Sequence, residues 1–247
     1  MEMMKFLFQG ESGLVVEFGS EIDPVVNTRV HATARQIAKE LSGLIEAVVP
    51  TYRSLLVIFD PTLISRSDLI KKIEKEAADS RAELCTACGN KIVVIPTLYG
   101  EDAGPDIDFV ASHNNLTVEE VIQIHTSVAY RIYMMGFTPG FPYLGGMSEK
   151  IAAPRLKTPR TNIPAGSVGI AGTQTGLYPV ESPGGWQLIG RTPLKVFNPR
   201  SKQPFLYEAG DQLQFERISA SDYDRIEKDV EAGRYFPRSL PIEEVVR

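Results

Sequence analysis

GFTPGFPYLGG, residues 136–146, opens the part of the sequence where glycine and proline are densest. Two related stretches follow, PRLKTPRTNIPAGSVGIAG at residues 154–172 and YPVESPGGWQLIGRTP at residues 178–193. Between Gly136 and Pro199 lie eleven of the 20 glycines and nine of the 17 prolines, with short apolar segments between them. Short strands joined by tight turns predict a closed β-barrel rather than an array of helices.

The sequence before this region predicts a second, smaller domain. KFLFQ (5–9) and LVVEFG (14–19) are strand-like segments on either side of a turn. Asp23-Pro24 supplies an N-cap and a first-turn proline for an amphipathic helix. Two apolar strands, a second helix and the strand KIVVIP (91–96) follow. A strand, a helix, two strands, a helix and a strand indicate a ferredoxin-like split β-α-β domain.

The predicted fold class is therefore α+β, with the ferredoxin-like split β-α-β domain at residues 1–88 and the β-barrel domain at residues 89–247. The second domain begins with an acidic helical stretch, in which TVEE (117–120) has the pattern of a capping box. The strand AGDQLQFERI and a surface helix end it.

The amino-acid composition restricts the kinds of partner that the chain can bind. The formal net charge is −5, and Lys and Arg are scattered along the chain, which disfavours nucleic acid as a partner. No apolar run approaches the roughly 18 residues that a membrane span needs, and the N-terminus has no pattern of a secretory signal. We expect a cytoplasmic protein that binds small molecules or other proteins and has no membrane partner.

Cys85 and Cys88 are the only cysteines, and their CxxC spacing raises redox or metal chemistry. A zinc site would need two more ligands, and His31, His113 and His125 lack the usual H-x₃₋₅-H spacing. We therefore expect plain thiols near the domain boundary and no metal site.

Arginines lie within the Gly- and Pro-rich segments. Proline lowers the entropic cost of a fixed loop, and glycine lets backbone N–H groups approach a ligand closely. Arg155, Arg160 and Arg191 add guanidinium groups, which bind carboxylates and phosphates. The pattern predicts an anionic small-molecule ligand, although each arginine taken alone is equally typical of a solvated turn.

His125 ends a predicted helix just before a strand that leads to Gly136. It could act as a general base at neutral pH, or it could stabilise the negative end of the helix dipole. Trp186 beside two glycines favours a packing role. The sequence has neither a P-loop nor a nucleophile elbow.

The quoted segments, together with AGDQLQF (209–215), resemble the signature blocks of the 5-oxoprolinase B-subunit family, whose members are also called allophanate hydrolase subunit 1 or KipI. The blocks follow in the family's order, and the resemblance spans nearly the whole chain. It implies a C-terminal cyclophilin-like β-barrel. It also implies that the chain works with two other 5-oxoprolinase components, a C component and an A component of the LamB/YcsF type. Such a complex opens 5-oxoproline to L-glutamate, with ATP as cosubstrate together with Mg²⁺.

The resemblance and the residue chemistry together indicate the site. Activation of the lactam oxygen by phosphorylation develops negative charge, which arginines and glycine-rich backbone could stabilise. The predicted catalytic residues are His125, Arg155, Arg160 and Gln174. The predicted substrate- or phosphate-binding residues are Gly136, Phe137, Gly140, Phe141, Ser167, Tyr178, Ser182, Gly184, Gly185 and Arg191.

The leading prediction is a 5-oxoprolinase B component that is active only with its partner components. One alternative is a KipI-like protein that binds a sporulation sensor histidine kinase and blocks its autophosphorylation. Another is a peptidyl-prolyl isomerase, which rests only on the implied barrel, and fold alone is poor evidence of activity.

Overall fold

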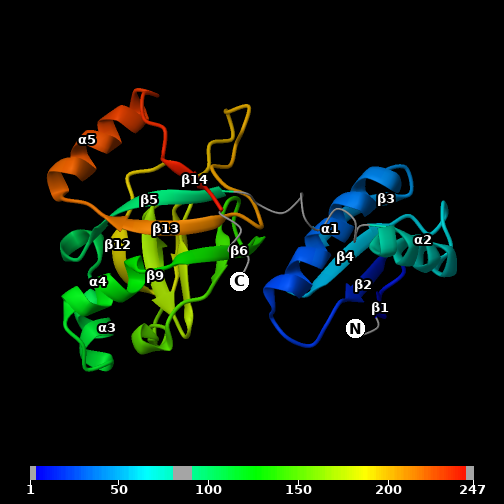
Figure 1. Cartoon of the computed structure of the whole chain (residues 1–247), viewed down its shortest axis with the longest axis horizontal. Coiled ribbons are helices and arrows are strands. Elements are labelled where there is room, and N and C mark those ends of the chain that lie inside the picture. Colours follow the sequence, from blue (N-terminus) through cyan, green and yellow to red (C-terminus); the bar gives the residue numbers. More distant parts are fainter. Residues whose placement is uncertain (1–3, 80–90, 243–247) are drawn as a thin grey trace. The chain divides into compact units, whose positions relative to one another are not determined.

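The structure, a computed structural model, describes residues 4–79 and 91–242 (Figure 1). The chain divides into two compact units, Met1–Gly89 and Asn90–Arg247. Cys85 and Cys88 lie outside the described residues. Of the helices in the described ranges, none is long and apolar enough to cross a membrane.

The first unit has, within residues 4–79, a four-stranded antiparallel sheet with the strand order β1-β2-β4-β3. Its elements in chain order are β1 (Lys5–Gln9), β2 (Gly13–Glu17), α1 (Pro24–Glu40), β3 (Ile45–Pro50), β4 (Ser54–Phe59) and α2 (Arg66–Asp79). Asp23 caps α1 as its sequence predicted, because its carboxylate accepts hydrogen bonds from the N–H groups of Val25 and Val26.

The core of the first unit lies between one face of the sheet and the helices. Leu55, Val57 and Phe59 alternate along β4 and are fully buried, because every second side chain of a strand points to the same face. They belong to one cluster with Ile37 of α1 and Ile73 of α2. Amphipathic helices and alternating strands thus bury one common apolar layer.

The second unit is a nearly closed β-barrel with helices around it (Figure 1). Its eight-stranded sheet within residues 91–242 follows the path β10-β9-β12-β5-β13-β6-β7, and β14 pairs with β5 beside this path. The strands are β5 (Lys91–Tyr99), β6 (Ala129–Met135), β7 (Pro142–Gly145), β9 (Ser167–Ala171), β10 (Gln174–Leu177), β12 (Gln187–Arg191), β13 (Gln212–Arg217) and β14 (Ser239–Pro241). The pair β5–β13 is parallel, and the other pairs are antiparallel.

Smaller elements surround the barrel. β8 (Arg160–Ile163) and β11 (Ser182–Gly184) form a separate two-stranded sheet. The helices are α3 (Ile107–His113), α4 (Val118–Thr126) and α5 (Ala220–Glu231), with short 3₁₀ turns η2 (Glu101–Ala103) and η3 (Glu149–Ile151). The capping box predicted for α4 is confirmed, because Thr117 and Glu120 exchange side-chain and backbone hydrogen bonds.

KIVVIP (91–96) was predicted to be the last strand of the sheet in the first domain, and this prediction was wrong. The segment begins β5, which pairs with β12, β13 and β14 in the second unit. The edge position beside β2 is occupied by β1 instead, in register from Lys5 with Glu17 to Gln9 with Gly13. A continuous apolar run identifies a strand buried on both faces, but it does not specify the strands with which it pairs.

A seam remains in the barrel between β7 and β10. These strands are the two ends of the sheet path and lie in contact without being paired in the described sheet. Phe141 directly precedes β7, and Tyr178 directly follows β10. At Gly176 within β10, an added Cβ would lie 2.9 Å from the Trp186 ring, so glycine allows that ring to pack against the seam.

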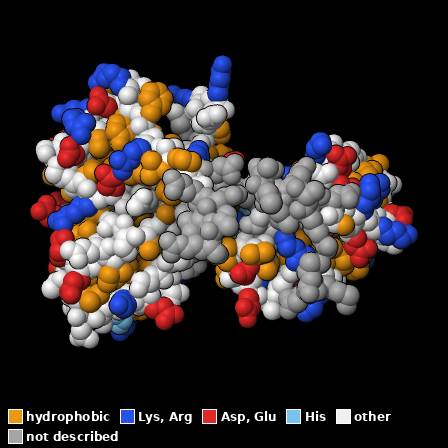
Figure 2. Space-filling view, viewed as in Figure 1, with side chains coloured by type: hydrophobic (Ala, Val, Ile, Leu, Met, Phe, Trp, Pro, Cys, Tyr) orange, Lys and Arg blue, Asp and Glu red, His pale blue; other side chains and the backbone are white. Residues whose placement is uncertain are grey.

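Lys/Arg and Asp/Glu side chains are interspersed over the face of the second unit that Figure 2 shows, and the same holds for the first unit. Such mixing of both signs agrees with the scattered charge of the sequence and its net charge of −5.

Candidate functional site

A pocket of about 450 Å³, which we call the aromatic pocket, opens beside the seam of the barrel. Its lining comes from the Gly- and Pro-rich segments and consists of Phe137, Phe141, Tyr143, Arg155, Pro159, Gln174, Tyr178, Pro183, Gly184, Gly185 and Trp186. It therefore brings together half of the predicted site residues, namely Phe137, Phe141, Arg155, Gln174, Tyr178, Gly184 and Gly185.

Phe141 lies at the centre of the aromatic lining. Its ring makes edge-to-face contacts with Tyr143, Tyr178 and Trp186, at centroid distances of 5.4, 5.5 and 5.8 Å. This geometry places the positive edge of one ring on the negative face of the next and favours a fixed arrangement. The pocket thus has a rigid apolar wall.

Polar groups of two kinds face this wall. The exposed Arg155 has its Cζ 6.0 Å from the centroid of the Trp186 ring, within the range of a cation–π contact. Burial raises the pKa of Tyr178 to about 12, against the opposing effect of the Arg155 and Arg160 charges. At neutral pH Tyr178 therefore keeps its proton and offers a neutral hydroxyl group.

Gly184 is required for the close packing of this wall. A Cβ at this position would lie 2.5 Å from the Tyr178 hydroxyl oxygen and 2.8 Å from Ile163 Cδ1. Real Cβ atoms do not approach other atoms so closely, so any larger residue would displace Tyr178.

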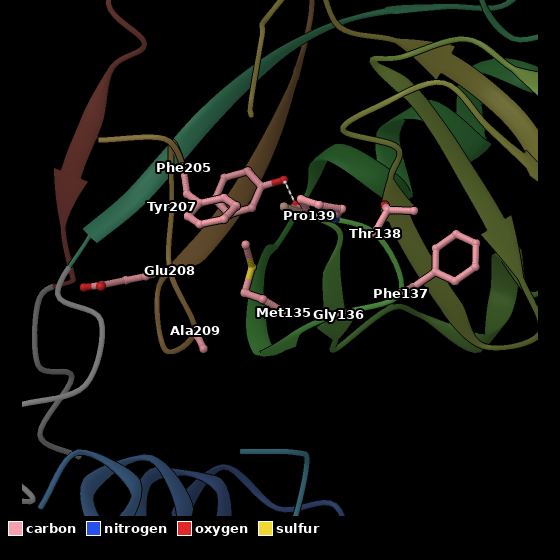
Figure 3. A pocket seen from close by; sticks show the side chains of 10 residues that line it. Met135, Gly136, Phe137, Thr138, Pro139, Phe205, Tyr207, Glu208 and Ala209 are labelled. Atoms are coloured by element: carbon pink, nitrogen blue, oxygen red, sulfur yellow. Dashed lines mark hydrogen bonds between the residues drawn. The ribbon is translucent and has the colours of Figure 1, made fainter. Parts of the chain in front are cut away.

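A second pocket, which we call the turn pocket, has a volume of about 400 Å³ (Figure 3). It is formed by Met135, Gly136, Phe137, Thr138, Pro139, Gly140, Phe205, Tyr207, Glu208 and Ala209. The Tyr207 hydroxyl donates a hydrogen bond of 2.9 Å to the Gly140 carbonyl oxygen, which Figure 3 shows as a dashed line. Gly136 and Gly140, two predicted site residues, lie here and not in the aromatic pocket.

Phe137 lines both pockets. Its backbone has φ +60°, a left-handed conformation that is costly for a residue with a side chain, and its side chain is 65% exposed. Figure 3 shows its ring directed away from Phe205 and Tyr207. The ring instead contacts Phe141 edge to face at 5.6 Å. Phe137 therefore stands at the border between the turn pocket and the aromatic pocket.

The remaining predicted arginines line neither pocket. Arg160 Nη2 is 2.7 Å from Asp106 Oδ1, and Arg160 Nη1 donates to the Trp186 carbonyl oxygen at 3.3 Å. Arg191 Nε donates to the Ala165 carbonyl oxygen at 3.1 Å. Both side chains thus contact the protein itself.

The two predicted serines also lie outside the pocket linings. Ser167 is buried in β9, where its N–H donates to the Pro164 carbonyl oxygen. The Ser182 hydroxyl donates to the Val180 carbonyl oxygen at 3.4 Å. These contacts are typical of residues that shape loops and strands.

His125 is fully buried inside the barrel, away from both pocket linings. Its Nδ1 is 2.7 Å from the Tyr99 hydroxyl, and its Nε2 is 2.8 Å from the Thr175 hydroxyl, which donates onward to the Gly169 carbonyl oxygen. This network assigns the proton to Nε2. Burial lowers the pKa of His125 to about 3, so the ring is neutral at neutral pH.

Sequence reasoning missed several contributors to the aromatic pocket. Trp186 was assigned to packing, although it also lines the pocket. Tyr143 lies within the quoted segments but was not singled out. Asp106, the partner of Arg160, lies outside those segments, and no local signal identifies its contacts.

Comparisons with known proteins show the family to which the chain belongs. The family model of the carboxyltransferase domain, subdomain C and D, matches residues 4–207, which include all residues of the aromatic pocket. The 5-oxoprolinase B subunit of Bacillus subtilis (strain 168) is 47% identical over 223 residues, which cover 87% of this chain and 92% of that protein. The chain belongs to the 5-oxoprolinase B-subunit family. The resemblance drawn from the sequence blocks is thereby confirmed.

Two solved structures extend the family comparison. The crystal structure of TTHA0988 is 33% identical with a TM-score of 0.72, over 85% of this chain and 40% of that chain. The K. lactis urea amidolyase is 21% identical with a TM-score of 0.74, over 96% of this chain and 16% of that chain. The family's fold thus recurs within much longer chains, of which this chain corresponds to less than half.

Proposed function

We propose that this chain is the B component of an ATP-dependent 5-oxoprolinase and that its aromatic pocket binds 5-oxoproline. The observation that carries the proposal is the exposed Arg155 at a rigid aromatic wall in a member of the B-subunit family. The complex opens 5-oxoproline to L-glutamate, with the other components completing the site.

The chemistry of the pocket matches this substrate. 5-Oxoproline is a small lactam ring with one carboxylate, and the Arg155 guanidinium suits a carboxylate. Rings such as Phe141 and Trp186 cover apolar ring surface. The amide of Gln174 can complement the N–H and C=O of a lactam, and Tyr178 supplies a neutral hydroxyl group.

Ring opening requires activation because a lactam is a stable amide. ATP transfers its terminal phosphoryl group to the lactam oxygen and leaves as ADP. Water then attacks the activated carbon, the ring C–N bond breaks, and the nitrogen takes up a proton, which leaves glutamate with its side-chain carboxyl group as an acyl phosphate. A second water molecule hydrolyses this acyl phosphate to L-glutamate and phosphate. During these reaction steps, Arg155 orients 5-oxoproline by binding the carboxylate of the substrate. The aromatic wall limits the access of bulk water.

We assign ATP and Mg²⁺ to the partner components C and A. The aromatic pocket has one basic side chain, Arg155, whereas a triphosphate usually needs several positive groups. We assign no proton transfer to His125, because a general base must reach its substrate and this side chain is enclosed.

We also propose a finer description of the fold, with a domain boundary at residues 88/89, one position before the division between the two compact units. The order β1-β2-β4-β3, with helices after β2 and β4, matches a ferredoxin-like split β-α-β sheet in which the first strand of the chain replaces the last. We propose that the first unit is such a permuted form and that the second is a cyclophilin-like β-barrel.

The test is ATP-dependent release of glutamate from 5-oxoproline. The chain is assayed alone and then with purified A and C components of a 5-oxoprolinase that are active with the Bacillus subtilis homologue of this chain. We expect turnover only in the complete mixture. No turnover in a mixture that is active with the Bacillus subtilis homologue would contradict the proposal and would favour the kinase-inhibitor alternative.

A further inference from the structure

Asp106 occupies the N-cap position of α3, but its side chain forms no hydrogen bond with the first turn of that helix. A capping aspartate ordinarily accepts from the N–H of the second or third helical residue. Asp106 Oδ1 instead accepts from Arg160 Nη2 at 2.7 Å, and Oδ2 accepts from the Leu188 N–H at 2.6 Å. Its carboxylate thus joins α3 to β8 and β12.

Arg160 completes this connection to the pocket wall. Its Nη1 donates to the Trp186 carbonyl oxygen at 3.3 Å, while the Asp106 N–H donates to the Leu188 carbonyl oxygen at 2.9 Å. The ion pair therefore holds both ends of the segment from Trp186 to Leu188. Arg160 also follows Pro159 directly, and Pro159 lines the aromatic pocket beside Trp186.

We propose that Asp106 and Arg160 are positioning residues that hold Trp186 as a wall of the aromatic pocket. Their side chains are 13% and 29% exposed, so solvent screens this pair less than a fully exposed ion pair. The guanidinium fork binds one carboxylate oxygen and one backbone oxygen, an arrangement that lysine cannot reproduce. The identity of the ligand in this inference rests on the proposed function, but the role of the pair in fixing Trp186 does not.

A direct contact of Arg160 with substrate fits the geometry less well. Arg160 lines neither the aromatic pocket nor the turn pocket, and both of its terminal nitrogens have protein partners. Arg155 differs, because it lines the pocket and lies over the Trp186 ring. One arginine is thus placed to meet the substrate and the other to support the wall.

Trp186 is the only tryptophan of the chain, so intrinsic fluorescence reports on this wall. The variants are Asp106→Asn, Arg160→Lys and Arg160→Ala. Arg217→Ala is the matched control, because Arg217 also forms an Arg–carboxylate pair, with Glu119, but does not line the aromatic pocket. The measurements are the emission maximum and the quenching by acrylamide of the purified full-length chain, followed by kcat and KM for 5-oxoproline in the reconstituted complex.

We expect all three variants to shift emission to longer wavelength and to increase quenching, with Arg160→Lys intermediate and the control unchanged. KM should rise about tenfold with kcat largely retained, since one charge-assisted contact is lost. In the double variant Asp106→Asn/Arg160→Ala, the changes should not exceed the larger single effect, because both residues act through one pair.

Emission and quenching equal to wild type in all three variants would overturn the proposal. So would a loss of kcat with unchanged emission and KM, which would make Arg160 a catalytic residue. Arg160→Lys retains the positive charge beside Asp106, so it keeps the test valid if Arg160→Ala does not fold. Because fluorescence is measured on the chain alone, a complex without 5-oxoproline turnover would refute the proposed function but leave this test intact.

Discussion

The surroundings of His125 and the aromatic pocket both combine aromatic rings with a polar side chain, yet they differ in access to solvent. His125 packs against Phe215 at a centroid distance of 4.6 Å, and both of its ring nitrogens have hydrogen-bonding partners inside the barrel. Arg155 lies over Trp186 at the surface of a pocket. The enclosed surroundings of His125 can stabilise the barrel, whereas the aromatic pocket, which is open to solvent, can receive a ligand.

This difference separates residues that the sequence had placed in one site. Chemical type alone made His125 and Arg155 equally suitable for catalysis. Exposure and internal hydrogen bonding distinguish them, because a polar group whose partners are all internal contributes to stability and not to recognition. Substitutions at each residue test the comparison, because one should change mainly stability and the other mainly substrate binding.

The largest effect is expected from His125→Ala. The substitution leaves a cavity in the core and removes the partners of the Tyr99 and Thr175 hydroxyl groups. The free energy of unfolding should fall by about 3–5 kcal/mol, as for other large-to-small core changes. Urea unfolding measures it. A raised KM for 5-oxoproline without any loss of stability would place His125 in the site and contradict the comparison.

Arg155→Ala should have the opposite profile. Removal of the carboxylate partner should raise KM for 5-oxoproline by about 30-fold to 150-fold, which corresponds to about 2–3 kcal/mol for a hydrogen bond to a charged group. Because Arg155 is exposed, thermal unfolding should be nearly unchanged. Steady-state kinetics of the reconstituted complex and a melting curve provide the two readings. An unchanged KM would remove Arg155 from the site.

The buried His125 should also make the free energy of unfolding depend on pH. The pKa of His125 is lowered from 6.5 to about 3 in the folded chain, so the unfolded chain binds the extra proton in this window. The contribution of neutral His125 to the free energy of unfolding is therefore fully present above pH 6.5. It falls by about 1.4 kcal/mol per pH unit as the pH drops toward 3. Between about pH 7 and 5 this amounts to about 2 kcal/mol. Unfolding of His125→Gln in the same buffers is the control, and an equal slope in both proteins would contradict the buried neutral histidine.

Gly184→Ala should have the smallest effect, and it should act on the aromatic pocket. Its Cβ would displace the Tyr178 hydroxyl and cost about 1 kcal/mol, at the low end of the range for overpacking. The melting temperature should fall slightly, and KM should rise more than kcat falls. Gly43→Ala is a comparison for the glycine change itself, because nothing lies within 4 Å of a Cβ there and its backbone is not in the left-handed region. Equal KM in both variants would show that the Tyr178 wall does not contact substrate.

Local signals in the sequence predicted the elements but not all of their partners. The caps at Asp23 and Thr117 depend on residues two or three positions away, and both are observed. The partners of β5 are determined by contacts with strands much later in the chain, as in the pair of Lys91 with Pro241. No periodicity within KIVVIP reports such contacts.

The candidate site was predictable to the extent that it lies in continuous segments. Arg155, Gln174 and the aromatic residues come from the quoted Gly- and Pro-rich stretches, and the structure brings them to one pocket. The enclosure of His125 depends on Tyr99 and Thr175, which lie 26 and 50 positions away. Burial of this kind arises only from the tertiary fold.

The central claim is that the aromatic pocket of this chain receives 5-oxoproline in the assembled complex. Fluorotryptophan incorporated into this chain alone gives one fluorine resonance, because Trp186 is the only tryptophan. The complex with unlabelled A and C components is titrated with 5-oxoproline and observed by fluorine NMR. We expect the resonance to shift in a saturable way, and the shift to be lost in Arg155→Ala. An unchanged resonance in a complex that releases glutamate would show that the substrate binds elsewhere and would contradict the account.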